Sequence, residues 1–133
     1  MNAAAKEAGV QSFGLFHDAG YRGLYGMGLS EIKEFKRLDP KDELLDRAGR
    51  TELAANEFRI TQTEDKLVRE NVEREQNAIN THSEVGGEVR ATIEKLGGTM
   101  PEHLPPEPSI KKLASGFKKE KKALPNGQSD NNH

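Results

Sequence analysis

Three polar side chains recur at a spacing of three within residues 51–67, a stretch whose composition predicts a helix. Asn56, Arg59 and Gln62 would form a polar stripe along one face of that helix. Guanidinium and amide groups recognise partners by hydrogen bonds and charge. An apolar side is also present, formed by Leu53, Phe58 and Ile60. We therefore predict a helix that packs one side into a core and offers its polar stripe to a partner.

A second set of binding residues lies in residues 20–28. Tyr21, Arg22 and Tyr25 combine aromatic surface with a guanidinium group, and these residue types dominate interface hot spots. A further candidate is Arg90, expected on the outer face of its helix. The alternative is structural: the tyrosines would fill gaps in a small core, and the arginines would be solvated.

Four glycines occur in residues 20–28, which raises the question of a phosphate-binding loop. The stretch lacks the spacing and the terminal Gly-Lys-Ser/Thr of a P-loop. Gly26 and Gly28 are not followed by the third glycine of the dinucleotide fingerprint. Glycine at this density disfavours a helix. We predict a structured loop whose aromatic side chains fold back on the core.

Residues typical of catalysis are not arranged for it. His17, His82 and His103 stand far apart, at spacings unlike those of metal ligands. His82 is expected near a helix cap, in a structural or exposed position. The chain has no cysteine and no nucleophile-elbow motif. We predict a non-enzymatic protein with no metal and no cofactor.

Charge divides the chain into two parts. Residues 109–133 hold six lysines against Glu120 and Asp130, a net of +4, so residues 1–108 carry −6 of the total of −2. The lysines are Lys111, Lys112, Lys118, Lys119, Lys121 and Lys122. They could make weak, salt-sensitive and non-specific contacts with single-stranded DNA. The alternative is a solvated tail without a ligand.

The predicted fold is all-α: a small bundle of about five or six short helices, a glycine-rich loop and a flexible basic C-terminal tail. Residues 1–108 form the helical domain, and residues 109–133 form a basic helix and a disordered tail. The other predicted elements are helices over 3–8, 12–20, 30–38, 40–49, 51–72 and 81–96, and a proline-rich extended linker over 99–108. The helix at 81 would begin with a capping box from Thr81 to Glu84.

Apolar content is low for a domain of this size. Leu, Ile, Val and Phe make up about a fifth of the 133 residues, and there is no Trp. A partner or self-association into a homo-oligomer would therefore complete the small core.

No apolar run is long enough to span a membrane, and the N-terminus has no signal-peptide core. We expect a soluble cytoplasmic protein.

Three passages resemble the C-terminal half of the bacterial DNA-damage-inducible protein D family. They are Gly20-Tyr21-Arg22-Gly23-Leu24-Tyr25-Gly26, the stretch from Thr51 to Leu67, and the stretch from Val85 to Glu102. Their order and spacing fit residues 8–113. The BRO-type region with which family members begin has no counterpart in this sequence, so we expect a short stand-alone relative or the C-terminal half of a longer protein.

The resemblance implies a function in the SOS response. The family is described as opposing strand exchange by RecA and as taking apart RecA filaments on single-stranded DNA. On this interpretation the polar stripe and the tyrosine loop contact filament protein, with the basic tail near the DNA. Two alternatives remain: a nucleic-acid-binding module that competes for single strands, and a phage or mobile-element regulator or inhibitor of another host machine.

Overall fold

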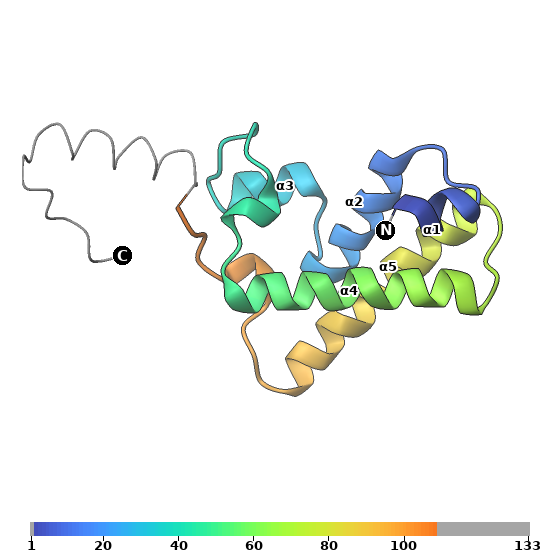
Figure 1. Ribbon diagram of the computed structural model, residues 1–133. Coiled ribbons are helices and arrows are strands. Elements are labelled where there is room, and N and C mark those ends of the chain that lie inside the picture. The colour runs from blue at the N-terminus through green and yellow to red at the C-terminus, as the bar shows by residue number, and fades with distance from the viewer. Residues whose placement is uncertain (1, 109–133) are drawn as a thin grey trace, which may run out of the picture.

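The computed structural model describes residues 2–108, which form five α-helices and two 3₁₀ turns and no strand (Figure 1). The elements in chain order are α1 Asn2–Glu7, α2 Phe13–Tyr25, α3 Leu29–Phe35, η1 Leu44–Arg47, α4 Arg50–Arg69, α5 Glu75–Lys95 and η2 Pro101–His103. The all-α prediction is therefore confirmed for this part of the chain. The helix and tail predicted for residues 109–133, with their lysines, lie outside the described residues.

Helices α2 and α5 form the most extensively packed pair, and α4 packs against α5 (Figure 1). Helix α1 contacts α4 near one end of the assembly, and α3 contacts α2 near the other. The short helices and turns thus close the two ends of a layer built from α2, α4 and α5. These three helices carry the residues that the sequence suggested for function.

Helix α2 overturns the prediction of a glycine-rich loop. Ser12 caps it as expected, since its Oγ accepts a hydrogen bond from the amide of Leu15 at 3.4 Å. The helix then runs through Gly20 and Gly23 and ends only at Gly26, which adopts a left-handed conformation with φ 77°. Tertiary packing has overridden the low helix propensity of glycine.

The reason is a close crossing of α2 over α5. A Cβ atom placed on Gly23 would lie 2.3 Å from the carbonyl oxygen of Ser83, and one on Gly86 would lie 2.7 Å from the carbonyl oxygen of Gly20. Real Cβ atoms do not approach backbone so closely. By contrast, a Cβ atom on the next residue, Gly87, would meet nothing within 4 Å.

Helix α5 begins earlier than the sequence predicted. It starts at Glu75, so Thr81 lies inside the helix, and the proposed capping box is wrong. The Thr81 hydroxyl instead donates to the carbonyl oxygen of Asn77 at 2.8 Å, one turn back. The Glu75 carboxylate accepts hydrogen bonds from the amides of Gln11 and Ser12, which ties the start of α5 to the start of α2.

Two further predictions need correction. The helix expected from residue 40 is reduced to the turn η1, and the proline-rich segment is not simply extended. It forms η2, where Pro101 and Glu102 are buried. The amide of Glu107 donates to the carbonyl oxygen of Arg47 at 2.7 Å, which keeps this segment against the body.

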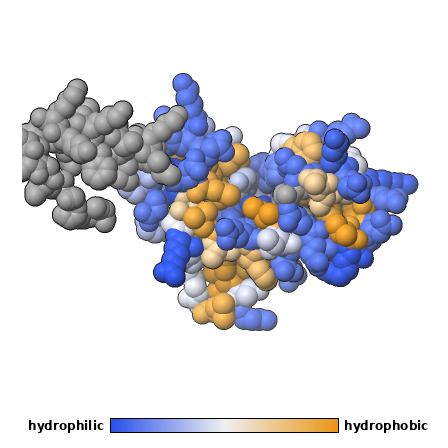
Figure 2. Space-filling model, in the orientation of Figure 1, coloured by the Kyte–Doolittle hydropathy of each residue, from blue (hydrophilic) through white to orange (hydrophobic). Residues whose placement is uncertain are grey.

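Two small hydrophobic clusters share the interior, as expected from the low apolar content. One centres on Leu24, Ile32 and Val89, and the other on Phe16 and Leu67. On the face shown in Figure 2, hydrophobic residues lie in separate patches between hydrophilic ones. No helix within residues 2–108 is long and apolar enough to cross a membrane.

Candidate functional site

The polar stripe of α4 faces mainly inward. Asn56 is 0% exposed and Arg59 is 1% exposed, whereas Gln62 lies on the surface. The buried positions of α4 recur every three or four residues, at Glu52, Asn56, Arg59, Thr63 and Leu67. The structure therefore corrects the orientation expected for Asn56 and Arg59: the polar face is the buried face of this helix.

These buried groups form one hydrogen-bonded chain between the two hydrophobic clusters. The Tyr25 hydroxyl donates to a Glu52 oxygen at 2.5 Å and accepts from the Asn56 amide at 2.9 Å. Arg59 donates to the Asn56 side-chain oxygen at 2.8 Å. Its guanidinium also lies 4.8 Å from the centre of the Tyr21 ring, which is half-buried. Because the groups satisfy one another, Tyr25 and Asn56 are structural residues in this fold.

Lys36 extends the chain at the α3 end. Its ammonium group donates to Glu52 at 3.2 Å and to the carbonyl oxygen of Leu104 at 2.5 Å. The Lys36 and Glu52 side chains are 2% and 1% exposed, so this is a buried ion pair. Sequence reasoning missed both residues and the burial of His82. One feature of the sequence could have indicated this polar interior: polar residues recur along α4 every three or four positions, which is the spacing of its buried face.

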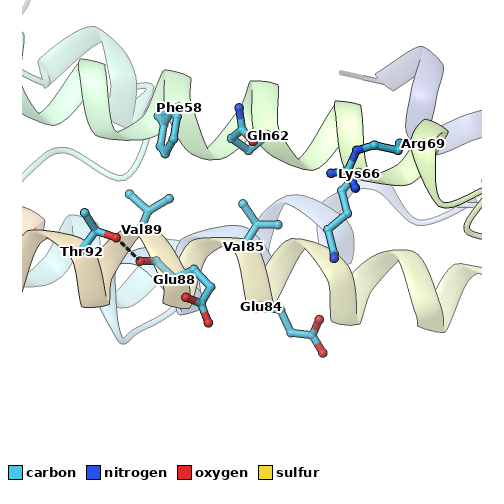
Figure 3. A pocket seen from close by; sticks show the side chains of 9 residues that line it. All are labelled: Phe58, Gln62, Lys66, Arg69, Glu84, Val85, Glu88, Val89 and Thr92. Carbon is cyan, nitrogen blue, oxygen red and sulfur yellow. Dashed lines mark hydrogen bonds between the residues drawn. The ribbon is translucent and has the colours of Figure 1, made fainter.

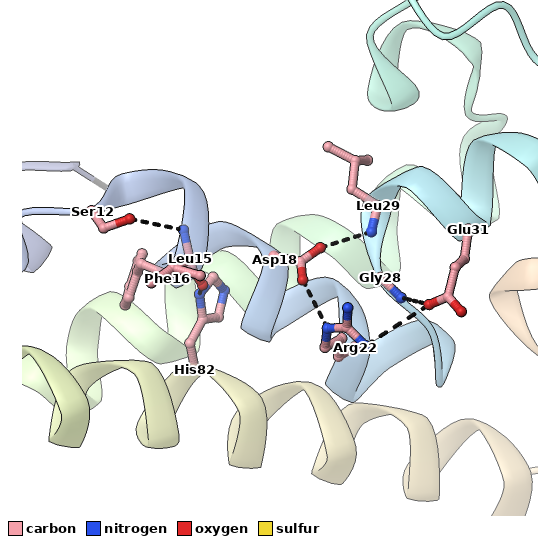
Figure 4. Close-up of polar contacts among 9 residues, drawn as sticks. All are labelled: Ser12, Leu15, Phe16, Asp18, Arg22, Gly28, Leu29, Glu31 and His82. Atoms are coloured by element: carbon pink, nitrogen blue, oxygen red, sulfur yellow. Dashed lines mark hydrogen bonds and ion pairs between the residues drawn. The ribbon is translucent and has the colours of Figure 1, made fainter.

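His82 lies at the other end of the chain, inside α5 and 0% exposed. Its Nδ1 is 2.8 Å from the carbonyl oxygen of Phe16, and its Nε2 is 2.6 Å from the Arg59 guanidinium (Figure 4 shows His82 and Phe16). A carbonyl only accepts and a guanidinium only donates, so the ring must be neutral with its proton on Nδ1. Burial, together with the charge of Arg59, lowers the pKa of His82 to about 3.

Stability should therefore fall as the solution is acidified from pH 7 to pH 5.5. The unfolded chain binds a proton at His82 near pH 6.5 while the folded chain does not, so the contribution of His82 is complete above pH 6.5 and is lost towards pH 3. We expect a loss of about 1 kcal/mol in the free energy of unfolding over this interval. Urea unfolding at both pH values measures it, and His82→Asn should abolish most of the difference.

A matched control is His17→Gln. His17 is half-buried and lies beside His82, with a ring-centroid distance of 6.4 Å, but makes no hydrogen bond to Arg59 among the described residues. The pKa of His17 is also lowered, by its partial burial and by the charge of Arg59, so this variant should lose part of the pH difference and keep the part that His82 contributes. A wild-type chain that is equally stable at both pH values would contradict the neutral, buried assignment of His82.

Of the three binding candidates Tyr21, Arg22 and Tyr25, only Arg22 lies on the open surface. Its guanidinium forms an ion pair with Asp18 at 2.7 Å and lies 3.8 Å from Glu31 (Figure 4). Asp18 also accepts a hydrogen bond from the amide of Leu29 at 2.8 Å. Arg22 thus helps to join α2 to α3 while remaining accessible.

We predicted that Arg90 would lie free on the outer face of its helix, and the structure corrects this prediction. Its two terminal nitrogens donate to the two carboxylate oxygens of Glu102, each at 2.8 Å, and one of them also reaches the carbonyl oxygen of Leu24 at 3.0 Å. This bidentate geometry fixes η2 against the crossing of α2 and α5. Arg90 is therefore occupied by an internal contact.

A surface groove of about 460 Å³ lies between α4 and α5 (Figure 3). Its lining residues are Phe58, Gln62, Lys66, Arg69, Glu84, Val85, Glu88, Val89 and Thr92. Phe58 is 54% exposed, an unusual position for a large aromatic side chain. Of the predicted stripe, only Gln62 lines this groove. Within residues 2–108, no group of three His, Asp or Glu side chains is placed as metal ligands would be.

Comparison with known proteins identifies the family. The sequence profile of the DinD C-terminal domain matches residues 1–113. The chain belongs to this family. The resemblance noted in three passages thus extends over residues 1–113 of this chain, which include the buried polar residues of α4 and the crossing of α2 and α5.

A relative from Escherichia coli (strain K12), DNA damage-inducible protein D, is 51% identical over 121 residues. The match covers 86% of this chain but 44% of the relative, so the chain spans less than half of that protein's length. No solved structure matches this DinD C-terminal domain.

Proposed function

We propose that this chain acts in the cytoplasmic DNA-damage response by binding RecA filaments on single-stranded DNA and destabilising them, without catalysing a reaction. Family membership carries the proposal, because the relative in Escherichia coli is named as DNA damage-inducible. The RecA part follows from what the family resemblance implies. In this proposal the chain acts on the filament through contacts with its protein, and not through contacts with the DNA.

The charge and the interior of the described domain support this choice. Residues 1–108 carry a net charge of −6, which repels DNA phosphates and favours a protein partner over direct DNA binding. The polar residues that might otherwise form a reactive cleft, from Glu52 to His82, are hydrogen-bonded to one another inside the fold, with only the Arg59 Nε left without a partner among the described residues. Exposed groups such as Arg22 and Phe58 remain for a partner.

The test is disassembly of preformed RecA filaments on fluorescent single-stranded DNA. We expect the full chain to remove filaments, and a variant with its six tail lysines changed to glutamine to keep most of that activity. The six positions are Lys111, Lys112, Lys118, Lys119, Lys121 and Lys122. Neutral glutamines remove the phosphate contacts while leaving the acidic domain unchanged.

The alternatives predict different results. If the lysine-free variant binds no DNA and loses all activity, competition for single strands is the better explanation. If neither protein affects filaments, the proposed function is wrong for this chain, and a role on another host machine becomes the leading alternative.

A further inference from the structure

The groove between α4 and α5 has walls of opposite charge. Lys66 and Arg69 line it on the α4 side, and Glu84 and Glu88 line it on the α5 side (Figure 3). Phe58 stands at one end of the α4 wall and is 54% exposed. One surface therefore carries both halves of a charge-complementary contact, together with a large apolar side chain.

The cations of the α4 wall are available to an occupant. Lys66 pairs with Glu70 and Arg69 pairs with Asp65, both at 2.9 Å and both one helical turn apart on the surface. Ion pairs of this kind contribute little free energy, so they give way easily to a better contact. Neither Asp65 nor Glu70 lines the groove.

The carboxylates of the α5 wall are available as well. Glu84 and Glu88 are exposed, and neither forms an ion pair with any residue between 2 and 108. An occupant that suits both walls must present cations to α5 and carboxylates to α4. The surface of this chain that has this property is the groove itself.

We propose that a second copy of this chain occupies the groove, in a two-fold symmetric pair in which α4 of each copy lies against α5 of the other. A two-fold axis parallel to the groove generates this pair, because it exchanges the two walls and keeps each level along the groove unchanged. The cations of each α4 then face the carboxylates of the opposite α5. A two-fold axis across the groove would instead place α4 on α4 and α5 on α5, with no cationic wall opposite the carboxylates.

The order of side chains along the groove agrees with this pairing. A short turn joins α4 to α5, so the two helices run in roughly opposite directions (Figure 1). Phe58 consequently lies across the groove from Val89, and the Lys66 end of α4 lies across from Glu84 (Figure 3). In the pair, Phe58 of each copy would lie over Val89 of the other, and Lys66 would lie at the level of the opposite Glu84.

Phe58 also answers the question of shape. Two hollow surfaces pack against each other only where side chains project into the space between them. Phe58 is the large apolar side chain of this groove that projects, since Val85 and Val89 are 9% and 7% exposed. Its burial in the pair would add apolar contact to a chain whose own core is small. Arg22 does not line the groove and stays accessible to the filament proposed above.

Analytical ultracentrifugation of the full chain tests the proposal. We expect a reversible monomer–dimer equilibrium. Phe58→Ser should raise the dissociation constant at least about tenfold, because it removes the side chain that fills the opposite groove. The matched control is Phe35→Ser, since Phe35 is 52% exposed and lies on α3, outside the groove. This control should leave the equilibrium nearly unchanged.

Charge reversal tests which walls meet. Lys66→Glu with Arg69→Glu leaves both walls anionic, and Glu84→Lys with Glu88→Lys leaves both walls cationic. Each variant alone should dimerise at least about tenfold more weakly than the wild type. Mixed in equal amounts, the two variants should form a heterodimer about as stable as the wild-type dimer, because each supplies the walls that the other lacks. Circular dichroism checks that both variants keep their helix content.

Controls at exposed sites outside the groove separate wall contacts from net charge. Lys6→Glu with Lys41→Glu, and Glu7→Lys with Glu73→Lys, match the two charge changes and should weaken the dimer much less. A chain that stays monomeric at millimolar concentration would overturn the proposal. A dimer that withstands Phe58→Ser and both wall reversals would also overturn it, in favour of another face. Reversed variants that stay monomeric when mixed would contradict the pairing of α4 with α5.

Discussion

Gly86→Ala is expected to destabilise the fold by about 3 kcal/mol, whereas the same change at the next residue, Gly87→Ala, should be neutral or slightly stabilising. The added methyl group at Gly86 would lie 2.7 Å from the Gly20 carbonyl oxygen and 2.9 Å from the Leu24 amide nitrogen. Both contacts are with backbone, so no side chain can rotate away. Relief requires α2 and α5 to separate.

Gly87 provides the control for helix propensity. It lies in the same helix, and its added methyl group would meet no atom within 4 Å. Alanine there should stabilise the folded state by about 0.5–1 kcal/mol through reduced backbone entropy of the unfolded chain. Urea unfolding followed by circular dichroism measures both variants. Similar stabilities for the two variants would show that α2 and α5 do not cross as closely as described.

The same crossing explains why the path of α2 could not be predicted from the sequence. Local propensity correctly identifies glycine as a poor helix former, and residues 20–28 contain four. The stabilising contribution comes from residues some sixty positions away: the backbone of Ser83 and Gly86 fits only against Gly23, and the His82 side chain occupies the space that a Cβ atom on Gly20 would need. A favourable contact between distant segments has no signature within the segment itself.

Helix α4 shows a different limit of sequence reasoning. Its position and its approximate ends were predictable from composition, and its polar periodicity was visible. The face assigned to solvent was wrong because polar residues at inward spacing satisfy one another in the core: Asn56 bonds to Tyr25, and Arg59 bonds to His82. A chain with few large apolar residues fills its interior partly with hydrogen-bonded polar groups.

This interior has a cost as well as a benefit. Arg59 is buried without a carboxylate partner, and its Nε has no hydrogen bond within the described structure. Burial lowers the pKa of Arg59 because the charged form loses hydration. The bonds to Asn56 and His82, and the face of Tyr21, offset that loss. Each member therefore depends on its neighbours, and single substitutions in this chain should be severe.

Glu52→Gln is expected to lower the free energy of unfolding by about 3 kcal/mol. The substitution keeps the size of the side chain but removes the negative charge that faces the Lys36 ammonium group at 3.2 Å. Lys36 and the Tyr25 hydroxyl donate to different oxygens of Glu52, and in glutamine one of these two positions is an NH2 group that only donates, so one of the two hydrogen bonds is lost. The result is a buried cation without its counter-ion.

Lys36→Met should recover most of that loss when it is combined with Glu52→Gln, although Lys36→Met alone should be about as destabilising as Glu52→Gln. In the double variant both substituted side chains are neutral, and the introduced glutamine can devote its carbonyl oxygen to the Tyr25 hydroxyl. A double-mutant cycle by urea unfolding gives the coupling between the two positions, which should be about 5 kcal/mol, because two losses of about 3 kcal/mol are replaced by one of about 1 kcal/mol. Small and additive losses would mean that water reaches the Lys36–Glu52 pair and screens it, and the buried polar chain would then end at Tyr25 instead of continuing to α3.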